Sequence, residues 1–74
     1  MIGVDIRRDS PVATIVQRSG PHLVHISTVK EPDYTALIIS LDRELVYWQQ
    51  VMGLPVIVEQ SDIDFLREKA SVGQ

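Results

Sequence analysis

The chain contains no cysteine, which excludes disulfide bonds, cysteine-ligated zinc and thiol catalysis. The reducing cytoplasm is the compartment that suits such a chain. No apolar run approaches the roughly 18 residues of a membrane span, and the opening segment MIGVDIRRDS has no signal-peptide core. We therefore expect a cytoplasmic protein that does not enter a membrane.

Motifs for catalysis and cofactor binding are also missing. The four glycines are isolated, so neither a phosphate loop nor a dinucleotide fingerprint is present. No serine lies in a nucleophile-elbow pattern. His22 and His25 are the only histidines, and on a strand their spacing places them on opposite faces, which disfavours a metal site. We expect a non-enzymatic chain with no metal and no cofactor.

The composition is that of a folded domain. Of the 74 residues, 45% are hydrophobic and 23% are charged, so residues 1–74 are expected to form a single domain with a frayed tail at 71–74. Only 5% are aromatic, whereas 24 are Val, Ile or Leu, which favours strands packed under one or two helices. A domain this small has a limited core, so binding to a partner or to itself would help to stabilise it.

The first 30 residues have the pattern of strands. The segment IGVDIRR alternates and places Ile2, Val4 and Ile6 on one side, as a half-buried strand requires. Residues 12–18 and 22–29 are rich in β-branched side chains, and the three-residue loop SGP joins them. We predict an antiparallel hairpin with its turn at Gly20.

Two interpretations are open for YTALIIS, residues 34–40. Its β-branched side chains and short length favour a strand, with Ser40 starting the helix that follows. A single long helix would instead present one apolar stripe, because large apolar side chains recur in steps of three and four at Tyr34, Leu37, Leu41, Leu45, Trp48 and Met52. We favour strand then helix, since a helix would be apolar all round at residues 36–39.

The end of the main helix is better specified, by Gly53 and Pro55 in GLP. PVIVE is then a short strand, and a last helix begins with Ser61 as N-cap and Asp64 as its capping-box partner. The predicted fold is a small α+β domain. It has a three- to four-stranded antiparallel sheet, one main helix packed on it and a short C-terminal helix.

The main helix carries more apolar surface than one buried stripe needs. At about 100° per residue, an arc of roughly 60° contains Leu41, Leu45, Trp48 and Met52. Tyr47 and Val51 widen that arc to roughly 160°. We expect Trp48 to lie in the core, and the last helix and tail to cover Tyr47 and Val51. The alternative is that both are exposed as part of a partner surface.

The charges are divided along the chain, with a net +2 in residues 1–30 and a net −5 in residues 31–74. An acidic half suits a basic partner surface. The predicted function is a small non-catalytic protein-binding regulator or inhibitor of a larger cytoplasmic machine. A nucleic-acid-handling enzyme such as RNA polymerase would be a suitable partner for the acidic half. The predicted contact residues are Tyr47, Val51, Glu44, Asp62 and Asp64.

Two alternatives remain open. A small DNA-binding transcriptional regulator would use Arg7, Arg8, Arg18 and Lys30. This is less favoured, because the basic surface lacks interleaved aromatic side chains and the first turn of the last helix is acidic. A self-associating structural protein would form a homodimer through Tyr47 and Val51.

Overall fold

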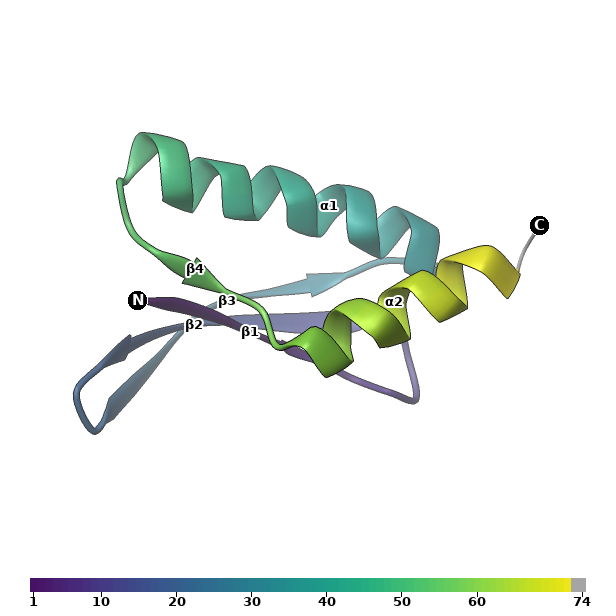
Figure 1. Cartoon of the computed structure of the whole chain (residues 1–74), viewed down its shortest axis with the longest axis horizontal. Helices are drawn as coiled ribbons and strands as arrows, with labels where there is room; N and C mark the ends of the chain where they lie inside the picture. The colour runs from purple at the N-terminus through teal and green to yellow at the C-terminus, as the bar shows by residue number, and fades with distance from the viewer. Residues whose placement is uncertain (73–74) are drawn as a thin grey trace.

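The computed structural model describes residues 1–72, and the side chains of residues 1–70. The frayed tail predicted for residues 71–74 therefore lies outside the part whose side chains are described. The elements in chain order are β1 (Ile2–Ile6), β2 (Val12–Ser19), β3 (His22–Lys30), α1 (Tyr34–Val46), the π-helical turn η1 (Tyr47–Val51), β4 (Val56–Ile57) and α2 (Gln60–Val72) (Figure 1). The predicted α+β fold is confirmed.

The four strands form one sheet in the order β3, β2, β1, β4. β1, β2 and β3 are antiparallel, as predicted, whereas the short β4 joins β1 in parallel and makes the sheet mixed. Gly20, with φ of 60°, turns β2 into β3. The loop is two residues long, one fewer than predicted, because Ser19 still pairs with His22.

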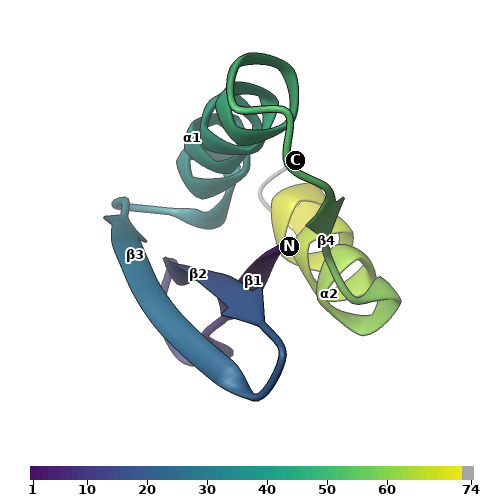
Figure 2. The ribbon, with the colours of Figure 1, turned by 90° about the vertical axis from the view of Figure 1, so that its left-hand side faces the viewer.

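The core lies on one face of the sheet. The alternation of β1 places Ile2, Val4 and Ile6 on that face, where they are buried with residues of β2 and α1 in a cluster completed by Ala13, Ile15, Leu37 and Leu41. α1 crosses this face, and α2 lies beside β4 at the edge of the layer (Figure 2). The other face of β2 and β3 carries no helix of the described chain, and Leu23 is 62% exposed there.

The preferred interpretation of residues 34–40 as a strand is wrong, because α1 begins at Tyr34. The Asp33 side chain caps the helix by accepting a hydrogen bond from the Ala36 N–H at 2.8 Å. Leu37 is fully buried, whereas Ile39 is 53% exposed on the opposite side. The cap and the buried stripe therefore outweigh the β preference of the side chains. Ser40 lies inside the helix instead of starting it.

The main helix ends as predicted, at Gly53, whose φ is 68°. Its last turn is widened, because the Met52 N–H donates to the Tyr47 carbonyl at 3.2 Å, five residues back. Trp48 is half-buried and packs against the core, but Val51 is 69% and Tyr47 46% exposed. The expectation that the last helix covers Tyr47 and Val51 is therefore wrong, and the part of it that concerns residues 71–74 falls outside the described side chains.

The last helix starts earlier than predicted. α2 begins at Gln60, and the N–H groups of Asp62 and Ile63 donate to the Glu59 carbonyl. Ser61 consequently lies in the first turn and is not the N-cap. Across residues 1–72, no helix has both the length and the apolar character to cross a membrane.

Candidate functional site

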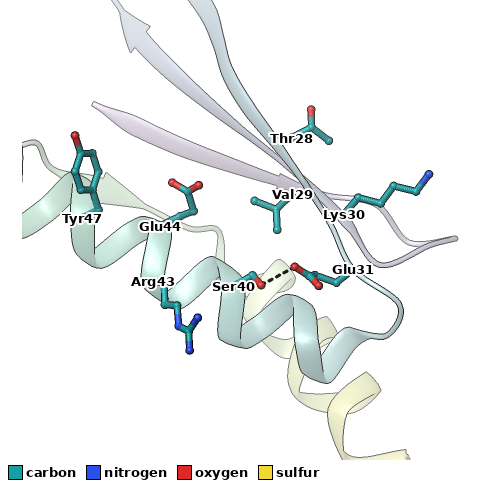
Figure 3. Close-up of a pocket in the computed structure, with 8 residues that line it drawn as sticks. All are labelled: Thr28, Val29, Lys30, Glu31, Ser40, Arg43, Glu44 and Tyr47. Atoms are coloured by element: carbon teal, nitrogen blue, oxygen red, sulfur yellow. Dashed lines mark hydrogen bonds between the residues drawn. The ribbon is translucent and has the colours of Figure 1, made fainter.

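A groove of about 540 Å³ runs between the strand β3 and the helix α1 (Figure 3). The β3 side contributes Thr28, Val29, Lys30 and Glu31, and the helical side contributes Ser40, Arg43, Glu44 and Tyr47. It is open and shallow, and both charged and apolar side chains line it. Glu44 and Tyr47, two of the predicted contact residues, lie in this groove.

The helical wall of the groove follows from the spacing of its residues. Ser40, Glu44 and Tyr47 are separated by four and three positions, so they share one face of the helix. The Ser40 hydroxyl donates to the Glu31 carboxylate at 2.7 Å, which joins the helix to the end of β3. This bond closes one end of the groove, and the Tyr47 ring stands at the other end (Figure 3).

Glu44 gives the middle of the groove its charge. Glu44 as a residue is partly buried, and its carboxylate extends from the helix toward β3 (Figure 3). No side chain within residues 1–70 forms an ion pair or hydrogen bond with it. The Arg43 guanidinium points away from the strand, and the Lys30 side chain also extends away from Glu44 (Figure 3). The groove therefore presents an acidic group to whatever lies beside β3.

The outer edge of β3 borders the groove. Within residues 1–72, β3 is the last strand of the sheet and pairs only with β2. The Glu31 N–H donates to the Pro11 carbonyl, and Val29 lies opposite Ala13. The backbone groups of residues 29 and 31 therefore face β2. The backbone N–H and C=O groups of Thr28 and Lys30 consequently point away from β2. These groups can pair with another strand.

A second cavity, of about 670 Å³, lies on the sheet face that α1 leaves open. Asp5 projects from β1 into this cavity, and Glu59 reaches it just after β4. The parallel register ends at the pair of Gly3 and Ile57, and Asp5 and Glu59 each follow this pair by two residues. The Arg18 side chain crosses the same face, with Nε 3.3 Å from the position of a Cβ on Gly3.

Two charged side chains of this second cavity, Arg8 and Asp62, already form an ion pair with each other. The Arg8 guanidinium donates to the Asp62 carboxylate at 2.8 Å, and Asp62 is only 6% exposed. Arg8 also stacks over the Phe65 ring, 4.3 Å from its centroid. Within the described residues, no group of three or more His, Cys, Asp or Glu side chains is arranged to hold a metal ion. Asp5 and Glu59 are two carboxylates of the kind that Mg²⁺ binds together with water and phosphate oxygens.

The predicted protein-contact residues fall into two groups. Glu44 and Tyr47 line the groove, and Val51 follows Tyr47 one turn later on the exposed end of the helix. Asp62 is buried against Arg8 and does not lie on this surface. Asp64 is exposed on α2, where its carboxylate accepts a hydrogen bond from Gln60.

The basic residues of the nucleic-acid alternative are separated in a similar way. Arg7 pairs with Asp9 at 3.1 Å, and Arg8 pairs with Asp62. Arg8 and Arg18 both line the second cavity, whereas Lys30 borders the groove. The two cavities thus divide these basic residues.

The sequence did not reveal the free edge of β3 or the shared cavity of Asp5 and Glu59. An acid in the middle of the apolar strand IGVDI was a signal for Asp5, because it marks the exposed face. Nothing local marks Glu59, whose position depends on how β4 joins the sheet.

Comparisons of this chain with protein-family models, with curated proteins and with solved structures found no match.

Proposed function

We propose that this chain is a small non-catalytic protein-binding domain that regulates or inhibits a larger cytoplasmic machine. The observation that carries this proposal is the exposed apolar end of the main helix. Tyr47, Val51 and Met52 are 46%, 69% and 50% exposed there, beside a groove with an unpaired acid. An exposed tyrosine among aliphatic side chains is typical of the centre of a protein interface.

The charge supports a basic partner surface. Residues 31–74 have a net charge of −5, and Glu44 has no charged side chain paired with it in the described chain. Enzymes that handle nucleic acids, RNA polymerase among them, carry basic surfaces to bind phosphates. A target of this kind would bind the domain less tightly as salt is raised.

An affinity pull-down from nuclease-treated host lysate tests this proposal. The wild type is compared with the double variant Tyr47→Ala, Val51→Asp, and with Ile39→Asp as a matched control. Ile39 lies on the same helix and is similarly exposed, but away from the groove. Circular dichroism verifies that all three are folded.

We expect a stoichiometric partner that the double variant loses and the control retains. Retention by the double variant would exclude this end of the helix as the contact surface. Sedimentation of the purified protein tests the homodimer alternative, because a dimer lost in the double variant would show that the exposed surface serves self-association.

A second candidate function is phosphate recognition with a divalent cation, in the cavity on the open face of the sheet. The presence of Asp5 and Glu59 in one cavity favours it, since Mg²⁺ is usually held by one or two carboxylates plus phosphate oxygens. Arg8 and Arg18 place guanidinium groups, which suit phosphates, at the same cavity. A nucleic acid bound there would touch the sheet and leave the groove free.

Amide NMR spectra recorded during titration with Mg²⁺, and then with a DNA or RNA oligonucleotide, test this second candidate. Shifts confined to residues 3–6 and 57–62, lost in Asp5→Asn and kept in Asp42→Asn, would support it. A spectrum unchanged at millimolar Mg²⁺ and with either oligonucleotide would show that this cavity binds neither.

A further inference from the structure

We infer that the partner binds as an extended segment carrying a lysine or arginine, which adds a fifth strand along the outer edge of β3. This inference rests on the proposed protein-binding function and specifies how the partner is recognised. Its elements are the free edge of β3, the groove beside it, and the unpaired carboxylate of Glu44.

The backbone of β3 supplies the first part of the recognition. β3 spans nine residues, and at its outer edge no strand of the described chain pairs with the N–H and C=O groups of Thr28 and Lys30. Exposed edges of this kind bind extended peptides through main-chain hydrogen bonds. Pairing at positions 28 and 30 would place the added strand directly along the groove between β3 and α1.

The side chains in the groove supply the specificity. In an added strand, alternate side chains would face the helix. There they would meet Val29 and the carboxylate of Glu44, with the Tyr47 ring at the end of the groove. A basic side chain pairs with Glu44, and a β-branched side chain two positions away covers Val29.

The same charges disfavour a second copy of this chain as the occupant. Edge-to-edge pairing of two β3 strands would bring two identical grooves together, each with the carboxylates of Glu31 and Glu44. The Lys30 and Arg43 side chains of the same groove extend away from Glu44 (Figure 3). Like charges brought together across an interface disfavour association. A basic segment from a different protein instead complements the groove.

A displayed library of random decapeptides tests the inference, with the wild type as bait. The strongest peptides are synthesised with a fluorescent label, and their affinities are measured by anisotropy. We expect the enriched peptides to contain a basic residue within an alternating β-branched sequence. Replacing Glu44 with Gln should weaken their binding roughly fivefold to tenfold, because it removes the charge that pairs with the basic side chain. The matched control Asp42→Asn, an exposed acid on the same helix, should leave affinity unchanged.

Peptide N-methylation tests the strand pairing itself. N-methyl groups placed one at a time should weaken binding at least about tenfold at every second position and have little effect between, because alternate N–H groups face β3. An absence of enriched basic peptides would overturn the inference. So would an affinity that Glu44→Gln leaves unchanged, or an effect of N-methylation on affinity that does not alternate along the peptide. If the pull-down still yields a partner that depends on Tyr47 and Val51, protein binding stands and only strand addition is wrong.

Discussion

Arg8 and Asp62, 54 positions apart in the sequence, form an ion pair with 2.8 Å between Nη2 and Oδ1. The pair joins the residues after β1 to the first turn of α2. Asp62 is almost fully buried, whereas the Arg8 side chain is about half exposed and packs over the Phe65 ring. Phe65 in turn contacts Tyr34 edge to face, so these contacts join α2 both to the residues after β1 and to α1.

Replacing Arg8 with Ala should lower the free energy of unfolding by about 1–3 kcal/mol, since it leaves a buried carboxylate without its donor. Urea unfolding followed by circular dichroism measures the change. Arg7→Ala is the matched control, because its ion pair with Asp9 lies on the surface. Equal losses of stability in the two variants would show that burial of Asp62 does not make the Arg8–Asp62 pair contribute more to stability than the Arg7–Asp9 pair.

Asp9 is expected to titrate abnormally. The hydrogen bond from Arg7, together with a backbone hydrogen bond and the charge of Arg7, holds the pKa of this carboxyl below its ordinary value of 3.8. A lowered pKa in the folded state stabilises the fold above the unfolded pKa, and this contribution is lost as the pH falls through the folded pKa. Carbon-13 NMR of the carboxyl group measures the pKa, which Arg7→Ala should raise toward 3.8. An unchanged pKa in that variant would contradict the assigned cause.

The helical assignment of residues 34–40 can be checked by two substitutions on opposite faces of α1. Leu37 is fully buried, so Leu37→Ala should cost about 2–5 kcal/mol of stability, enough to unfold much of a domain this small. Ile39 is 53% exposed, so Ile39→Ala should change stability by less than about 1 kcal/mol. A strand would place positions 37 and 39 on the same face. Similar losses from both substitutions would therefore contradict the helix.

Much of the sheet could be predicted from the sequence because its signals are local. The alternation at Ile2, Val4 and Ile6 and the turn at Gly20 each specify a strand or a turn without reference to the rest of the chain. Residues 34–40 were misassigned because β-branched side chains favour a strand locally, while the deciding interactions are the Asp33 cap and burial of Leu37 on the sheet. Burial against a distant element outweighs a propensity of a few tenths of a kcal/mol.

The site was predictable only where one helix determines it. The spacing of Glu44, Tyr47 and Val51 places them near one another on any helix, and in the structure they lie on consecutive turns of the main helix. The pairing of Asp62 with Arg8 was not predictable, because it depends on how α2 returns to the end of β1. The edge of β3 depends on the strand order, which no single segment encodes.

The hydrogen bond between Ser40 and Glu31 links the stability of the domain to the shape of the groove. It is partly buried and its acceptor is a carboxylate, so Ser40→Ala should lower the free energy of unfolding by about 1–2 kcal/mol. The carboxylate of Glu31 would then be free to turn toward the edge of β3, because Oε1 loses the donor that holds it beside the helix. Under the strand-addition proposal a second carboxylate then faces the added strand. Basic decapeptides should therefore bind the folded variant at least as tightly as the wild type. Denaturant unfolding and anisotropy measure the two effects separately. A variant that is less stable and also binds basic peptides less tightly would show that this bond holds the groove in its binding geometry. In that case Glu31 contributes to binding through the position of β3 relative to α1, and not through its charge.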